Sequence, residues 1–150
     1  MTASPRHSVS VAAAVIRADG RILAIRRRDN GQWEPPGGIL ELDETIEEGL
    51  TREVSEETGL FVEVDHLTGV YKNMTHGIIA LVFRCLLING TPHPTPEASE
   101  AAWLTPDEVR EHMNPAFAIR LLDAIEDHPG GPAIRTHDGK DLLADVKTRS

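Results

Sequence analysis

The segment 37–60, GGILELDETIEEGLTREVSEETGL, limits what this chain can be more than any other stretch of it. Two glycines lead through an acidic loop into a helix-forming run in which Glu53, Glu56 and Glu57 crowd together. Like charges three or four residues apart on a helix repel each other and lower its stability. A bound cation would offset that repulsion, because hard divalent ions such as Mg²⁺ take oxygen ligands and share them with substrate phosphates. We therefore interpret these three glutamates as metal ligands.

Local signals place both ends of the expected helix. Thr45 with Glu48 three residues later forms a capping box, so the helix is expected to begin next to Thr45. Glu48 and its neighbour Glu47 are then interpreted as acids on a solvated helix face. Gly59 can adopt the left-handed conformation that commonly follows the last residue of a helix. These two caps predict one continuous helix between them.

One face of this helix is expected to be apolar. The positions that recur every four residues are Ile46, Leu50 and Val54. At about 100° per residue, Glu53 and Glu57 lie along one edge of that stripe, at the boundary between core and solvent. Gly49, one turn before Glu53, is expected to leave the surface bare so that a bulky charged ligand can approach.

The fixed positions of the segment resemble the Nudix box. They are Gly38, Glu44, Arg52, Glu53, Val54, Glu56, Glu57, Gly59 and Leu60. Every one is filled at the family's spacing, which is far more specific than an isolated glycine motif, and the resemblance extends from about Val9 to about Leu122. It implies an α/β fold, a Nudix-type α/β/α sandwich with a mixed β-sheet. It also implies a Mg²⁺-dependent pyrophosphohydrolase, with Mn²⁺ as the alternative ion, that cleaves a nucleoside diphosphate linked to another moiety.

The resemblance also implies roles for individual residues. The metal ligands are expected to be the Gly37 carbonyl with Glu53, Glu56 and Glu57, and Glu53 is either a ligand or the base that activates water. Arg52 is placed with the catalytic residues, because it can hold a carboxylate in position. Relatives often add an acid from a later loop, and Glu97 is preferred to Glu100 for that catalytic role. Glu44 is expected to orient the helix start and Arg52.

Three further residues are candidate substrate contacts. Arg27 ends an expected strand within an arginine triplet, and arginine forks suit phosphate oxygens. Trp33, in the loop before the glycines, either stacks on substrate or anchors the loop by packing, which is the commoner role of tryptophan. His76 is either an ordinary strand-end histidine or a substrate contact at the mouth of the following strand.

The substrate is constrained only by elimination. Relatives specific for ADP-ribose often carry a proline shortly after the box, and residues 61–90 contain none. A nucleoside triphosphate or deoxynucleoside triphosphate is therefore favoured over ADP-ribose. The alternative from another class is a catalytically silent Nudix fold that binds a nucleotide and regulates a partner. The chain keeps every acid of the box, which favours the enzyme.

Composition restricts the partners and the compartment. A formal net charge of −9 over 150 residues argues against broad binding to nucleic acid or to an anionic membrane. No apolar run is long enough to span a bilayer. The single cysteine, Cys85, excludes an internal disulfide and suits a reducing compartment, so we expect a cytoplasmic monomer or homodimer. Residues 1–8 are expected to be flexible, 9–128 to form the Nudix domain, and 129–150 to form a tail, either a small hairpin or a subunit contact.

The remaining chain supplies the expected strands and helices. Residues 9–17 and 21–28 are expected to pair as an antiparallel hairpin through Asp19-Gly20. Residues 78–88 form the most apolar run and are expected to be a central strand, with Arg84 paired to a carboxylate of the box helix. Thr105-Pro106 and Asn114-Pro115 each predict a helix start. The expected apolar face of the last helix consists of Ile119, Leu122 and Ile125.

Overall fold

A computed structural model describes residues 3–126 and 128–144 of the chain. The strands are β1 Ser8–Val15, β2 Ile22–Arg27, β3 Trp33–Glu34, β4 Gly37–Ile39, β5 Phe61–Asn73, β6 Ile78–Asn89, β7 Ala98–Leu104 and β8 Ala133–His137. The helices are α1 Ile46–Thr58, α2 Pro106–His112 and α3 Pro115–Ile125. None of these helices is long and apolar enough to cross a lipid bilayer.

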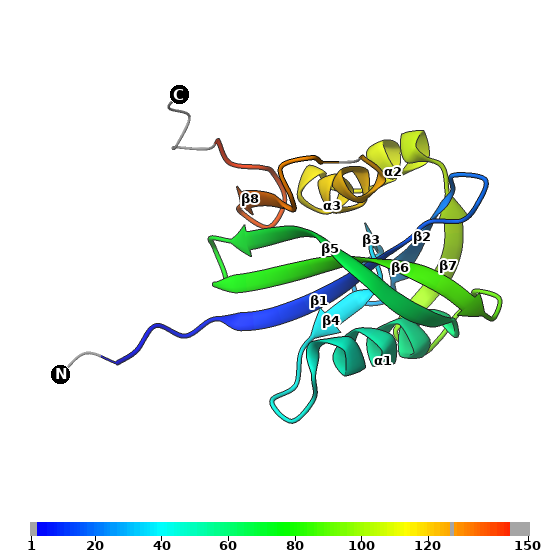
Figure 1. Cartoon of the computed structure of the whole chain (residues 1–150), viewed down its shortest axis with the longest axis horizontal. Helices are drawn as coiled ribbons and strands as arrows, with labels where there is room; N and C mark the ends of the chain where they lie inside the picture. The colour runs from blue at the N-terminus through cyan, green and yellow to red at the C-terminus, as the bar shows by residue number, and fades with distance from the viewer. Residues whose placement is uncertain (1–2, 127, 145–150) are drawn as a thin grey trace.

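The strands form two sheets between layers of helix. The larger sheet has the order β4-β1-β6-β5-β8 and is mixed, because β1 pairs with β6 and β5 with β8 in parallel, while the other pairs are antiparallel. The smaller, antiparallel sheet has the order β3-β2-β7. Helix α1 lies on one side of the sheets, and α2 and α3 lie on the other (Figure 1). The expected α/β fold with a mixed sheet is thus confirmed.

Strands β1 and β2 do not form the expected hairpin. They share one isolated bridge, Ile16 to Ile22, and then diverge into different sheets. Both edges of β1 are already paired, with β4 on one side and β6 on the other. The prediction of a regular antiparallel pair was therefore wrong, because a turn signal is local and cannot show which strand edges are taken.

The caps of α1 agree with the sequence, but its faces agree only in part. Thr45 and Glu48 exchange both bonds of a capping box, and Gly59 has the left-handed φ of 80°. Ile46 is 40 % exposed and so lies outside the core. A Cβ at Gly49 would lie 2.5 Å from Cδ1 of Leu40. The small size of Gly49 therefore admits the preceding loop, and the expected ligand approach at this glycine was wrong.

Strand β6 is central, as expected. Its side chains alternate between the two faces of the sheet, and this places Arg84 on the side of α3 and away from the box helix. Arg84 pairs in register with Ala14, which belongs to the core cluster beneath α3. Its Nη1 lies 3.5 Å from the carbonyl oxygen of Ala124 on α3. Cys85, on the opposite face, is buried in the cluster beneath α1. The expected pairing of Arg84 with the box helix was wrong, because the residue points to the other side of the sheet.

Helix α3 buries only part of the expected face: Ile119 and Leu122 are half-buried and pack against the core cluster. Its buried residues are Ala116, Ala118, Arg120, Leu121, Asp123 and Ala124, whereas Ile125 is 36 % exposed. The buried Asp123 accepts two bonds from Arg135 of β8, at 2.7 and 2.8 Å, and one from the Tyr71 hydroxyl at 2.7 Å. A polar network therefore fixes α3 to β5 and β8, which apolar periodicity does not detect.

The described part of the C-terminal tail extends the larger sheet. β8 pairs with β5 along Gly69 to Asn73, and His137 then bridges back to Leu142. The turn between them includes the expected Asp138-Gly139 pair, with Gly139 at a φ of 105°. The described part of the tail thus turns back at Asp138-Gly139, and β8 is an additional strand that the sequence did not predict. The choice between a small hairpin and a subunit contact for residues 129–150 stays a prediction.

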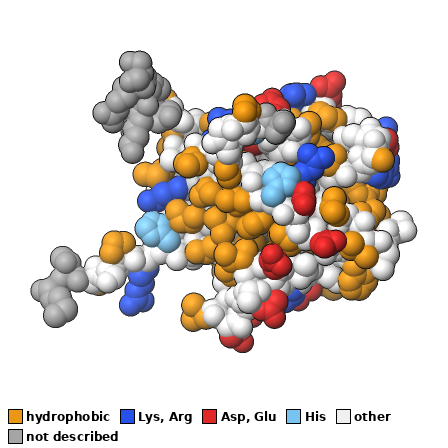
Figure 2. All heavy atoms as spheres, in the orientation of Figure 1, with side chains coloured by type: hydrophobic (Ala, Val, Ile, Leu, Met, Phe, Trp, Pro, Cys, Tyr) orange, Lys and Arg blue, Asp and Glu red, His pale blue; other side chains and the backbone are white. Residues whose placement is uncertain are grey.

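Helix α1 covers only part of the larger sheet. Figure 2 shows hydrophobic side chains gathered on the sheet face between β8 and α1. One row runs across the register from Ile134, which is 82 % exposed, to the half-buried Val70 and Leu81. The clustered acids and the arginines of the strand end lie elsewhere, around the end of β2 and the second half of α1.

Candidate active site

A cleft of about 510 Å³ lies where α1, β4, the end of β2 and the loop before β7 meet. Its lining residues are Arg27, Arg28, Asp29, Gly37, Gly38, Ile39, Glu53, Glu57, Pro96 and Glu97. Five of these residues were expected from the sequence, namely the acids Glu53, Glu57 and Glu97, the arginine Arg27, and Gly37. The tertiary fold therefore joins the two ends of the box to segments far away in the sequence.

Three carboxylates converge in the cleft. One oxygen each from Glu53, Glu57 and Glu97 lie within 4.8 Å of one another. Burial raises the pKa of Glu57 to about 8, against a bond from the Gly37 N–H that favours the charged form. Burial also raises the pKa of Glu53 above its ordinary value. Oxygen ligands converging in a partly buried place fit a divalent cation, which would favour the ionised forms of Glu53 and Glu57.

Arg52 contacts three acids, one before α1 and two on it. Its guanidinium donates to Glu44 at 2.6 and 2.9 Å, to Glu53 at 2.9 Å and to Glu56 at 3.3 Å. This bidentate bond lowers the pKa of Glu44 to about 2. The expected link between Arg52 and Glu44 is therefore present. Glu56 is half exposed and lies outside the three-acid cluster, so its role as a ligand stays a prediction.

Both glycines of the turn are needed for close approach. The Gly37 N–H donates to Glu57 Oε1 at 2.7 Å, which aims that carboxylate at the turn. A Cβ at Gly38 would lie 2.5 Å from Glu53 Oε1, and one at Gly37 would lie 2.2 Å from the Val11 carbonyl oxygen. Side chains here would displace either the acid or the sheet. The metal-ligating role of the Gly37 carbonyl stays a prediction.

The loop that carries Glu97 is attached to the end of α1. The last carbonyls of a helix have no partner inside it, and this loop supplies two. The His93 N–H donates to the Thr58 carbonyl at 3.1 Å, and the Thr95 hydroxyl donates to the Glu57 carbonyl at 3.2 Å. Thr95 is buried and also accepts from the Ala98 N–H at 3.2 Å. Glu97 is therefore held beside the helix that bears the other two acids.

Glu97 and Glu100 are separated by these contacts. Glu97 joins the cluster in the cleft, whereas Glu100 pairs with Arg26 at 3.8 Å on the strand surface. The structure thus brings Glu97, and not Glu100, to the other two acids, and the catalytic role of Glu97 stays a prediction. Thr95, which positions the loop, was not singled out from the sequence, since nothing local marks a threonine in a Pro-rich loop as buried.

Two arginines face the cleft instead of the expected one. The β2–β7 pairing shifts register between Arg26 and Arg27, past Ser99 of β7, and β2 ends at Arg27. Arg27 and Arg28 both line the cleft at this strand end. Arg27 pairs with Asp29 at 2.9 Å and lies 3.9 Å from Glu34. Arg28 donates to the Thr95 carbonyl at 2.8 Å. The strand end therefore offers positive charge beside the acids.

Trp33 and His76 lie outside the residues that line this cleft. Trp33 packs against the core cluster beneath α3, with its ring centroid 6.4 Å from that of His112. His76 is exposed in the turn between β5 and β6, and its N–H donates to the Asn73 side chain at 3.1 Å. The packing interpretation of Trp33 agrees with this placement. Substrate contact by either residue stays a prediction.

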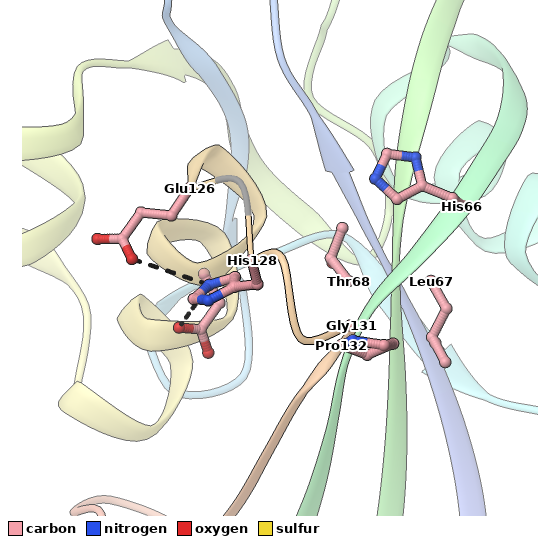
Figure 3. A pocket seen from close by; sticks show the side chains of 8 residues that line it. His66, Leu67, Thr68, Glu126, His128, Gly131 and Pro132 are labelled. Atoms are coloured by element: carbon pink, nitrogen blue, oxygen red, sulfur yellow. Dashed lines mark ion pairs between the residues drawn. The ribbon is translucent and has the colours of Figure 1, made fainter.

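A second, smaller hollow of about 130 Å³ lies at the end of α3, far from the acids of α1. In Figure 3 the His128 ring is aimed at carboxylates of the helix end, whereas His66 points away from it. His128 Nε2 lies 3.7 Å from Asp123 Oδ1 and 3.8 Å from Glu126 Oε2. The hollow contains none of the predicted site residues.

Comparison with known proteins agrees with this geometry. The family model described as the NUDIX domain matches residues 6–125. A "MutT-like protein" of Streptomyces ambofaciens is 61% identical over 142 residues, which cover 95% of this chain and 91% of the relative. An "ADP-ribose pyrophosphatase" of Methanocaldococcus jannaschii is 36% identical over 102 residues, covering 63% of this chain and 60% of the relative.

Solved structures share the fold. A Nudix hydrolase from Nitrosomonas europaea aligns with a TM-score of 0.75 at 23% identity, over 90% of this chain and 82% of the neighbour. The matched family region contains the box and the cleft, and the 61% identical relative spans nearly the whole chain. This chain therefore belongs to the Nudix family, and it is a Nudix hydrolase.

Proposed function

We propose that this Nudix hydrolase is a Mg²⁺-dependent pyrophosphohydrolase that cleaves a nucleoside diphosphate linked to another moiety, with a (d)NTP-like nucleotide favoured over ADP-ribose. The single observation that carries the proposal is the convergence of Glu53, Glu57 and Glu97 in a cleft that Arg27 and Arg28 also line. Acids that suit a cation and arginines that suit phosphate thus share one space.

Each group has a distinct task in the proposed reaction. A bound divalent ion neutralises charge on the attacking and leaving oxygens of a phosphoryl transfer. Glu53, Glu57 and Glu97 would hold that ion through carboxylate oxygens. Arg27 and Arg28 orient the diphosphate by charge-assisted hydrogen bonds. Arg52 keeps Glu53 in place by a bond of 2.9 Å, and Glu53 remains the candidate to accept the proton of the attacking water.

ADP-ribose is the second candidate substrate. It is supported by the name of the Methanocaldococcus jannaschii relative, an ADP-ribose pyrophosphatase that is 36% identical over 102 residues. The absence of a proline from residues 61–90 argues against it by comparison with the family pattern. A cytoplasmic location and a monomeric or homodimeric state stay predictions.

The test is a substrate panel with purified protein and Mg²⁺. The panel contains the ribonucleoside and deoxyribonucleoside triphosphates and ADP-ribose, with products separated by chromatography. Glu57→Gln is expected to lower the activity at least about 100-fold. Glu47→Gln, on the exposed first turn of α1, is expected to keep the wild-type activity. Full activity in the presence of a chelator, or in Glu57→Gln, would contradict the proposal. Cleavage of ADP-ribose alone would reverse the order of the two substrates.

A further inference from the structure

The two arginines that line the cleft differ in how their charge is compensated. Arg28 donates from Nε to the carbonyl oxygen of Thr95 at 2.8 Å, which is a neutral acceptor. Arg27 instead donates from Nε and Nη2 to the two carboxylate oxygens of Asp29, at 3.0 and 2.9 Å. A bidentate bond of this kind is the strong arrangement for a guanidinium and an oxyanion. The charge of Arg27 is therefore already compensated by an acid two residues later in the chain.

A second acid faces the remaining nitrogen of Arg27. Its Nη1 lies 3.9 Å from Oε1 of Glu34 on β3. Burial raises the pKa of Glu34 above its ordinary value, and the charge of Arg27 opposes that rise. A guanidinium binds an oxyanion through pairs of neighbouring N–H groups. Each nitrogen of the Arg27 guanidinium already has a carboxylate within 4 Å, so a phosphate that forms a bidentate bond with Arg27 competes with one of these acids.

Asp29 is the acid that a phosphate displaces more easily. It lies just after β2, its side chain is 62 % exposed, and it lines the cleft itself. The side chain of Glu34 is only 19 % exposed, and its backbone is fixed in the sheet by pairing with Ile25. An ion pair between exposed side chains contributes little free energy, so a phosphate that offers more charge breaks it readily. The bond from Arg27 also lowers the pKa of Asp29, which is therefore ionised at pH 7.

We infer that Asp29 sets the affinity of the cleft for phosphate, because its carboxylate occupies the fork of Arg27 until a phosphate of the ligand takes its place. This inference rests on the proposed binding of a diphosphate at Arg27. The phosphate oxygens accept the N–H bonds that Asp29 gives up, and the freed carboxylate turns toward solvent. Asp29 thus lowers the affinity for every ligand whose phosphate uses Arg27. The same competition weakens binding of the phosphate product and favours its release.

A role of Asp29 in holding Arg27 in place for the ligand predicts the opposite change. If the carboxylate only aimed the guanidinium, its removal would weaken phosphate binding. Because the carboxylate competes with the ligand, its removal is expected to strengthen phosphate binding. Asp29→Asn distinguishes the two roles, since asparagine keeps the shape and one acceptor oxygen of the side chain but loses its charge and its second acceptor.

Pyrophosphate binding in a chelator measures this competition apart from catalysis. Pyrophosphate is titrated into the metal-free wild type and into Asp29→Asn by isothermal calorimetry. Asp29→Asn is expected to bind about 5-fold more tightly, because the ligand no longer breaks an ion pair or meets a displaced negative charge.

The chain offers a matched control in Asp19→Asn. Asp19 accepts the same bidentate bond from Arg17, at 3.0 and 2.6 Å, and both side chains are similarly exposed. Neither residue is among the described residues that line the cleft. Pyrophosphate affinity of Asp19→Asn is therefore expected to stay within about 1.5-fold of the wild type, since exposed charges far from the ligand are screened.

An Arg27→Lys background separates competition for the fork from a general effect of charge. Lysine keeps the positive charge but cannot form the bidentate bond with Asp29. In this background Asp29→Asn is expected to change pyrophosphate affinity by less than about 2-fold, because the two substitutions act on one interaction. A gain as large as in the wild-type background would show that Asp29 acts without the fork of Arg27.

The results separate this inference from the proposed function. Equal or weaker binding by Asp29→Asn, no measurable binding by either protein, or the full gain in Arg27→Lys would overturn the inference even if the enzyme cleaves nucleotides. Tighter binding by Asp29→Asn that depends on Arg27 would support the inference even if no nucleotide of the panel is cleaved, in which case only the proposed reaction fails.

Discussion

Replacing Glu57 by glutamine separates the stability cost of this buried acid from its role in activity. Glu57 is 2 % exposed, and its Oε1 accepts the Gly37 N–H at 2.7 Å. Glutamine keeps that acceptor and the shape of the side chain but cannot ionise. In metal-free protein the variant is therefore expected to be more stable than the wild type, although it is expected to be inactive with Mg²⁺. A residue that served only to stabilise the fold would give the opposite result.

The magnitude follows from the pKa of Glu57, which burial raises from 4.5 to about 8. The folded state therefore prefers the protonated acid. Its contribution to stability is fully present below pH 4.5 and is lost progressively as the pH rises toward about 8. At 1.36 kcal/mol for each pH unit above 4.5, ionisation destabilises the metal-free fold by about 1 kcal/mol at pH 5 and about 3 kcal/mol at pH 7.

Urea unfolding in a chelator measures this difference. The advantage of Glu57→Gln over the wild type is expected to grow by about 2.5 kcal/mol between pH 5 and pH 7. Glu56→Gln, one position away on the exposed side of α1, is expected to stay within about 0.5 kcal/mol of the wild type. Adding Mg²⁺ or Mn²⁺ is expected to stabilise the wild type and not Glu57→Gln. An advantage of Glu57→Gln that does not change with pH would refute the reasoning.

Two further changes test the elements that hold the site together. Thr95→Val removes the hydroxyl that fixes the loop of Glu97, so kcat is expected to fall about 10-fold. Thr95→Ser keeps a hydroxyl and is expected to keep most of the wild-type kcat. Equal kcat values in the two variants would show that the hydroxyl is irrelevant. Asp123→Asn weakens the buried bidentate pair with Arg135 and is expected to lower the free energy of unfolding by about 3 kcal/mol. Arg110→Ala breaks only an exposed pair and is expected to cost less than about 1 kcal/mol, so similar losses in the two urea titrations would contradict the role of burial.

The features that depend on neighbouring residues could be predicted from the sequence. The capping box of Thr45 and Glu48 and the left-handed Gly59 were correct, since each arises from contacts within one helical turn. The spacing of the box also identified Glu53 and Glu57, which lie one turn apart on α1 and therefore share a face whatever the rest of the fold does. Family, reaction class and two of the three clustered acids follow from this one helix.

The tertiary structure decided everything that depends on which segments meet. Glu97 rather than Glu100 reaches the acids because Thr95 attaches the loop to the end of α1. Arg27 and Arg28 both line the cleft at the point where the β2–β7 pairing shifts register past Ser99, although simple alternation separates them. β8 brings His137 into contact with Arg120, which lies 17 residues earlier in the chain. Short-range spacing fixes a helix and its faces, but strand edges, bulges and buried polar pairs are set by contacts between distant residues, and in this protein those contacts complete the site.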